Sequence, residues 1–189
     1  MRPPVRPLLL LVAALLTTVA LGACGNKETE TLEGETEGIY LDLGGLKYQV
    51  QISRQLNPAD PEDEGYLVGI PAEERELAAD ETWYGIFIRV QNIGDDPRQA
   101  AEDFEIRDTQ ENVFRPIDLA RENVFAYRPA RVGAKGLIPE LDSPAAENTI
   151  QGSLLLFKIR YENLQNRPLE FEVVHPEDPE RTAAVALDV

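Results

Sequence analysis

The sequence predicts an all-β fold, an antiparallel two-sheet sandwich of about seven strands with two long loops. After residue 39, apolar side chains recur mainly at every second position, a period that is typical of strands with one buried face. The apolar segments are short and are separated by Gly, Pro, Asn and Asp, which form turns. Apolar residues make up 43% of the chain, which is enough for a folded core.

The first two predicted strands are the most clearly patterned. LKYQVQIS, residues 46–53, alternates strictly, and TWYGIFIRVQN, residues 82–92, carries apolar side chains on both faces. We therefore expect the first to have one buried face and the second to be covered on both sides for part of its length. The expected buried face of the first strand consists of Leu46, Tyr48, Val50 and Ile52.

Five further segments complete the expected set of strands. GSLLLFKIR is a continuous apolar run of the kind found in central, buried strands. In DTQEN, residues 108–112, we expect a turn in which Asn112 takes the left-handed conformation. The five segments are DFEIRD (103–108), VFRPI (113–117), GSLLLFKIR (152–160), LEFEVV (169–174) and TAAVALDV (182–189).

Two long connections interrupt the strands, at residues 54–81 and 117–150. Long loops in compact domains are usually functional or mobile. Within the second connection, LARENVFAY at residues 119–127 predicts one short helix.

The N-terminal 23 residues have the pattern of a secretory signal peptide, with Arg2 and Arg6 before an apolar stretch. The only cysteine, Cys24, follows Leu21-Gly22-Ala23, and these four residues resemble the lipobox of bacterial lipoproteins. That resemblance implies a cleaved leader and fatty acyl chains on Cys24, which would anchor the protein to the outer side of the cell membrane. A plain secretory signal and an uncleaved membrane span are the alternatives.

Residues 24–38 contain five Glu, one Lys and no aromatic side chain. Such a segment buries little apolar surface and is expected to be an acidic, flexible tether. The expected organisation is thus a signal peptide at 1–23, a lipidated Cys24 with its tether to residue 38, and a sandwich at 39–189.

Within the sandwich, three stretches resemble the telokin-like, immunoglobulin-like domain of unknown function found in many bacterial lipoproteins. They are WYGIFIRVQNIGDDP, FEIRDTQENVFRPI and GSLLLFKIR, and the resemblance covers roughly residues 44–175. These are turn and core motifs, so the resemblance implies an immunoglobulin-like sandwich and a role in display or binding.

Composition argues against several classes of function. With 34 acidic and 18 basic side chains, the net charge is −16, which disfavours nucleic-acid binding because phosphate contacts need Lys and Arg. Only three serines and one histidine, His175, are present, so few nucleophile and base pairs are available. We expect no enzymatic activity and no cofactor; a hydrolase that uses paired carboxylates is an alternative.

An acidic loop at residues 59–65 is a candidate site for a weakly bound divalent cation. Hard cations take several carboxylate and carbonyl oxygens, although the loop lacks the regular Asp spacing of a calcium loop. The candidate ligands are Asp60, Glu62, Asp63 and Glu64.

Basic and aromatic side chains gather between residues 121 and 135 in a chain that is otherwise acidic. Arg and aromatic residues are enriched in the centre of protein interfaces, so this segment is a candidate surface for a protein or envelope partner. Pairing of these cations with carboxylates of the same domain is the alternative. The candidate residues are Arg121, Phe125, Tyr127, Arg128, Arg131 and Lys135.

Together these features predict a lipid-anchored, extracytoplasmic binding module of the bacterial cell envelope that catalyses no reaction. A lipoprotein that binds a cation or small ligand through the acidic loop is the alternative.

Overall fold

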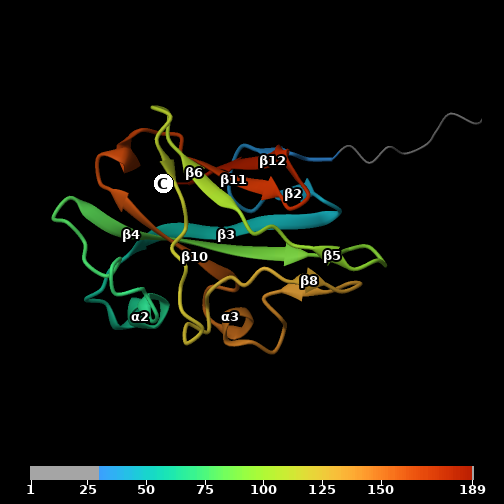
Figure 1. Ribbon diagram of the computed structural model, residues 1–189, viewed down its shortest axis with the longest axis horizontal. Helices are drawn as coiled ribbons and strands as arrows, with labels where there is room; N and C mark the ends of the chain where they lie inside the picture. Colours follow the sequence, from blue (N-terminus) through green and yellow to red (C-terminus); the bar gives the residue numbers. More distant parts are fainter. Residues whose placement is uncertain (1–29, 189) are drawn as a thin grey trace, which may run out of the picture.

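Two β-sheets pack face to face, and the fold is the all-β sandwich that the alternating pattern predicts (Figure 1). The computed structural model describes residues 30–188. The first sheet has the order β1-β12-β11-β6-β7 and is antiparallel except where β1 pairs in parallel with β12. Its strands are β1 Glu33–Gly34, β6 Phe104–Arg107, β7 Val113–Phe114, β11 Glu170–His175 and β12 Asp178–Ala186.

The second sheet has the order β10-β4-β3-β2, and β9 pairs with part of β4. Two further strands, β5 and β8, pair with each other. All seven predicted strands are present, and the sequence reasoning missed the shorter β1, β2, β5, β8 and β9. The strands of the second sheet and the small pair are β2 Tyr40–Leu43, β3 Leu46–Leu56, β4 Glu81–Gln91, β9 Leu137–Ile138, β10 Ser153–Arg160, β5 Arg98–Gln99 and β8 Arg131–Val132.

The second sheet is covered on both faces. Its inner face packs on the first sheet through a large core that includes Tyr48, Phe104 and Phe171. Its outer face carries a second cluster, where Trp83 and Phe87 pack against residues of the two long connections. Every residue of β4 from 82 to 88 is buried, which confirms the expectation that this strand is covered on both sides.

The expected position of Ile52 is wrong. Leu46, Tyr48 and Val50 are buried as predicted, but Ile52 is 37% exposed. The pairing register between β3 and β4 shifts between Val50 and Ile52, and a bulge of this kind turns the following side chains to the other face.

The helix expected at residues 119–127 is absent, and the short helices lie elsewhere. In its place the side chain of Asn123 organises the segment: its oxygen accepts the backbone N–H groups of Phe125 and Ala126, both at 2.9 Å. Those donors are then not available to a helix. The observed helices are α2 Pro61–Glu64, α3 Pro144–Glu147 and the 3-10 turns η1 Gly65–Leu67 and η2 Asn163–Gln165.

The boundary expected at residue 39 also changes. Residues 31–38 lie against the domain, because β1 pairs with β12 and the Glu37 carboxylate accepts the backbone N–H groups of Ser53 and Asp188. Residues 31–38 therefore belong to the sandwich and not to a free tether. The signal peptide at 1–23, Cys24 and residues 25–29 lie outside the described residues.

The turn between β6 and β7 is built around a buried carboxylate. Asp108, which is 3% exposed, accepts hydrogen bonds from the side chains of Asn112, Asn163 and Asn166 and from two backbone N–H groups. Burial by itself would raise the pKa of Asp108, but the bonds from these asparagines hold it well below its usual range. The left-handed residue is Glu111, with φ of 63°, and not Asn112 as expected.

No helix within residues 30–188 is long and apolar enough to cross a membrane.

Candidate functional site

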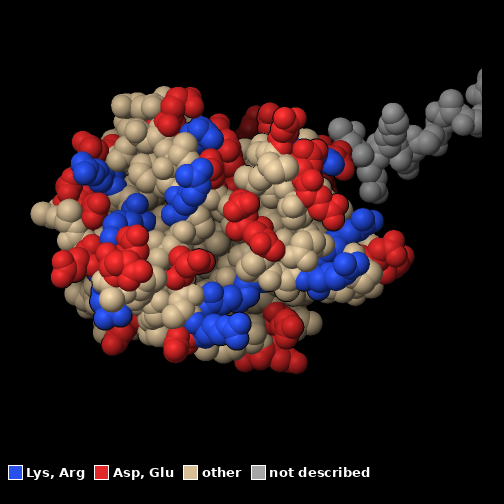
Figure 2. Space-filling view, viewed as in Figure 1, with Lys and Arg blue, Asp and Glu red and all other residues tan. Residues whose placement is uncertain are grey.

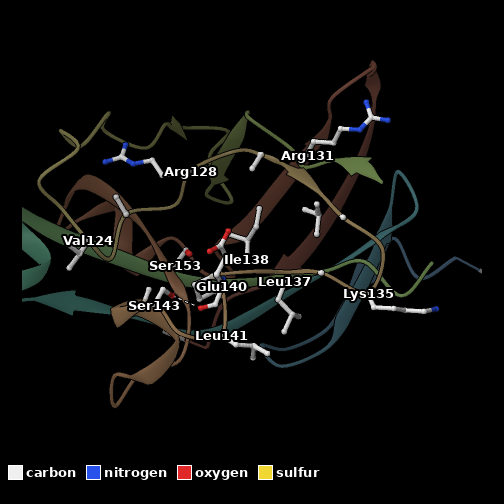
Figure 3. Close-up of a pocket in the computed structure, with 17 residues that line it drawn as sticks. Val124, Arg128, Arg131, Lys135, Leu137, Ile138, Glu140, Leu141, Ser143 and Ser153 are labelled. Carbon is white, nitrogen blue, oxygen red and sulfur yellow. Dashed lines mark hydrogen bonds between the residues drawn. The ribbon is translucent and has the colours of Figure 1, made fainter. Parts of the chain in front are cut away.

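A groove of about 520 Å³ opens in the layer that covers the second sheet, between the segment leading into β8 and the segment running from β9 to α3 (Figure 3). Its walls and floor are largely apolar, and its wall residues Val124 and Leu141 are 57% and 66% exposed. The apolar residues that line this groove include Val124, Ala126, Val132, Leu137, Ile138 and Leu141.

The side chain of Ser153 also belongs to the lining of the groove. Ser153, the first residue of β10, is 3% exposed and lines the groove. Within residues 30–188 the hydroxyl of Ser153 makes no hydrogen bond, and this hydroxyl is accessible from the groove. A hydroxyl that is accessible from the groove and bonds to no protein group can bond to water or to a ligand that enters the groove.

The groove offers polar groups beside its apolar surface. In Figure 3, Ser153, Ser143 and Glu140 lie near the centre of the groove, and the backbone carbonyl of Glu140 accepts the hydroxyl of Ser143 at 2.6 Å. No histidine is among the residues that line it; the single histidine, His175, borders a separate, small hollow with Arg98. Ser153 therefore has no imidazole base beside it to activate it as a nucleophile.

The structure brings together three of the six residues that the sequence nominated as a partner surface. Arg128, Arg131 and Lys135 line the groove and reach outwards around its rim (Figure 3). The Arg128 guanidinium donates to the carbonyls of Leu119 and Ala120 at 2.8 and 2.6 Å. Lys135 forms an ion pair with Asp95 at 3.2 Å.

The other three nominated residues are placed differently. Tyr127 is buried in the main core, where its hydroxyl donates to the carbonyl of Ala101 at 2.8 Å and burial raises its pKa far above the usual range. Phe125 packs into the outer cluster, edge-on to Tyr66. Arg121 is exposed but does not line the groove. Tyr127 is thus buried, whereas Phe125 is only partly buried.

Charge around the groove differs from the rest of the molecule. Three cations and one carboxylate, Glu140, line it, whereas the chain as a whole carries −16. Figure 2 shows Lys and Arg gathered beside α3 and over β5 and β8, with Asp and Glu abundant elsewhere on this face.

The acidic loop is organised by its own contacts. Asp60 caps α2, where its side chain accepts the backbone N–H of Glu62. Asp63 is 1% exposed, pairs with the guanidinium of Arg54 and accepts the backbone N–H of Asn57 at 2.7 Å. Among the described residues, no group of three or more His, Cys, Asp or Glu side chains is arranged to hold a metal ion. The structure therefore does not gather Asp60, Glu62, Asp63 and Glu64 around a common point.

Sequence reasoning missed most of the groove. Ser153 stands in a strand-like run, and nothing local distinguishes it from the first residue of an ordinary strand. Val132, Ile138 and Leu141 come from a connection in which no strand was expected. The useful signal was the local excess of cations, because Arg128, Arg131 and Lys135 line the groove.

Comparison with known proteins gives structural neighbours only. No protein-family model and no curated protein matches the chain. The yjhA protein of Bacillus subtilis matches with 11% identity over 82% of this chain and 99% of that chain, at a TM-score of 0.48.

Two further structures are similar at comparable levels. The candidate lipoprotein ycdA of Bacillus subtilis has 12% identity over 84% of this chain and 39% of its own, at a TM-score of 0.46. An uncharacterised β-sandwich protein of Clostridium difficile 630 has 6% identity over 85% of this chain and 98% of its own, at a TM-score of 0.42.

Proposed function

We propose that this protein is a lipid-anchored, extracytoplasmic binding module of the bacterial cell envelope, with an immunoglobulin-like sandwich that catalyses no reaction. In this proposal the signal peptide is removed, Cys24 carries the acyl chains, and the groove beside β9 binds a protein partner. Two or more acyl chains give stable membrane attachment, whereas one gives only marginal binding.

The observation that carries the binding role is the free hydroxyl of Ser153 in an apolar groove. A ligand that bonds to this accessible hydroxyl replaces a bond to water, and the net contribution of such an exchange is about 0.5–1.5 kcal/mol. Exposed Val124 and Leu141 beside it add apolar surface that a partner would remove from water. We do not propose the cation-binding alternative, because Asp63 is already paired with Arg54.

The anchor is tested by the change Cys24→Ser in the full chain. We expect the wild-type protein in the membrane fraction, with a mass that shows acyl chains on Cys24 and no leader, and the variant released from it. An unmodified Cys24, or a mature chain that still contains Arg2, would rule out the lipoprotein assignment.

The binding role is tested by photo-crosslinking in intact cells. A photoreactive amino acid at Leu141, on the groove, is compared with one at Tyr161, which is also exposed but follows the opposite end of β10. We expect a discrete adduct from position 141 only, and its loss when Ala130→Trp fills the groove from the exposed wall. Equal adducts from both positions, or none from 141, would contradict the proposal.

A further inference from the structure

The geometry points to the class of partner that the groove takes: an extended peptide that adds as a strand to the free edge of β9 and carries both apolar and acidic side chains. This inference rests on the proposed function, because it names what binds in the groove. Strand addition to an exposed sheet edge is a common mode of peptide recognition, with main-chain bonds for affinity and side-chain pockets for specificity.

The backbone of β9 is open on the side of the groove. Ile138 pairs with Val90, Leu137 with Gln91, and the N–H of Asn92 bonds to the carbonyl of Gly136. In an antiparallel pair, hydrogen-bonded positions alternate with positions whose N–H and C=O point away. Leu137 lies between the bonded positions, so its N–H and C=O point away from β4. Within residues 30–188 no other strand pairs with that edge.

The groove can hold the side chains of such a peptide. Val132 and Ile138 are 4% and 9% exposed and provide an apolar surface next to Leu137. In an added strand, successive side chains point to opposite faces, so every second residue would enter the groove. A peptide whose inward residues are apolar would bury them there, and a backbone or side-chain polar group could bond to the hydroxyl of Ser153.

The rim favours acidic residues in the outward positions. Arg131 is exposed, and within the described part of the chain it forms no ion pair. Lys135 forms an ion pair with Asp95, whose side chain is 93% exposed, and also donates to the carbonyl of Ile93. Such exposed ion pairs contribute little. A carboxylate of the peptide could therefore reach either cation. The negative charge of the remaining surface would repel an acidic peptide elsewhere, which favours this docking position.

The groove is held in shape without a ligand. Asn92 is fully buried at the end of β4, and its side-chain nitrogen donates to the carbonyls of Asp96, Val132 and Gly133 at 2.8, 3.1 and 3.0 Å. Its oxygen accepts the N–H of Gly94 at 2.9 Å. These bonds fix the turn between β8 and β9 against the sheet, so the peptide would meet a formed edge and binding would require little ordering of the protein.

The test uses the full chain, matured in its membrane and reconstituted in lipid nanodiscs, and a short fluorescent peptide of alternating Val and Glu. We expect saturable binding by fluorescence anisotropy. N-methylation of the peptide amides that face the backbone of β9 should weaken binding at least about tenfold. Each methyl group removes the N–H of one main-chain hydrogen bond and adds a steric clash. Replacement of every Glu by Lys should weaken it by a similar factor.

Variants of the protein distinguish the contribution of main-chain bonds to β9 from that of the cationic side chains on the rim. Leu137→Pro removes the N–H that faces the groove and spares the bonds to β4, and Leu137→Ala is its control. We expect only the proline variant to lose the sensitivity to amide methylation, provided that the fluorescence of Trp83 shows both to be folded. The double change Arg131→Gln and Lys135→Gln should remove the preference for Glu over Lys.

The outcomes distinguish the strand-addition inference from the proposed binding role. Absence of saturable binding, or equal binding of the methylated peptide, overturns the strand-addition inference. If a crosslinked partner still forms at position 141 in cells, the proposed binding role stands and only the class of partner is wrong. If that adduct is also absent, the proposed function itself fails.

Discussion

Replacement of Asp108 by Asn should be among the most destabilising isosteric changes in this protein. Asp108 closes the turn between β6 and β7 and joins it to η2, which precedes β11. Its carboxylate is nearly inaccessible and receives three asparagine amides and two backbone N–H groups. Asn has almost the same shape but only one accepting oxygen, so the change tests the hydrogen bonds with little effect on packing.

The magnitude follows from the donors that lose their acceptor. One carboxylate oxygen accepts Asn163 and Asn166 at 3.1 and 2.8 Å, and the other accepts the backbone N–H groups of Gln110 and Asn112 at 2.9 and 3.0 Å. Either orientation of the new amide leaves at least two donors facing an NH₂ group. Bonds to a charged acceptor contribute about 1.5–3 kcal/mol each. After allowance for the lower cost of burying a neutral amide, we expect a loss of about 3–4 kcal/mol.

The pH dependence gives a second signature of the same interactions. The pKa of Asp108 is lowered in the folded protein, so the stability it contributes is present above the unfolded pKa of about 3.9 and is lost as the pH falls through the lower folded value. The difference in unfolding free energy between wild type and Asp108→Asn should therefore be constant from about pH 7 to about pH 5 and should narrow below about pH 4.

Urea denaturation followed by the fluorescence of Trp83 measures this difference, because Trp83 is the only tryptophan and is buried in the outer cluster. The exposed residue Asp142 supplies a matched control, and Asp142→Asn should change the unfolding free energy by less than about 0.5 kcal/mol. A loss below about 1 kcal/mol for Asp108→Asn, or a difference that does not narrow in acid, would refute the reasoning.

Three other predictions test separate parts of the structure. Asn92→Ala should lower the free energy of unfolding by about 1–3 kcal/mol and speed amide exchange in the β8–β9 turn, because the side-chain bonds to that turn are lost. Unchanged amide exchange would argue against this role of Asn92. Burial raises the pKa of Tyr48 and Tyr84 to about 12, so ultraviolet titration should show them protonated past pH 10, with stability lost as the pH rises toward 12. Glu37→Gln should make residues 31–38 more sensitive to protease; equal cleavage would show that these bonds do not hold the segment.

Most of the fold follows from the sequence because the core strands are long and regularly patterned. The seven predicted strands carry most of the apolar residues of the two clusters, and burial of such residues dominates folding. The strands that were missed are two to four residues long, too short to show a period. Ile52 was placed wrongly because a bulge depends on the partner strand, which local alternation does not reveal.

The failed helix has a different cause. LARENVFAY has residues that are compatible with a helix, but the decisive interaction is between Asn123 and the carbonyls of Tyr66 and Val68, at 2.8 and 2.9 Å. Those carbonyls lie more than fifty positions earlier in the chain, as the sequence separations of 57 and 55 show. A long-range bond of this kind overrides local propensity. The same limit applies to the groove, whose Ser153 and Leu137 meet only because β9 and β10 both border β4.

The attachment of residues 31–38 to the sandwich changes how the proposed anchor would position the groove. Only six peptide units separate Cys24 from Glu30, which pairs with Arg181 beside β12, and six units reach at most about 20 Å. A tether that ran to residue 38 would have reached about 50 Å. If Cys24 carries lipid, the end of the sandwich where residue 30 lies (Figure 1) stays close to the bilayer. The groove beside β8 and α3 would then be on the flank of a membrane-proximal domain, where extended segments of neighbouring envelope proteins can reach it.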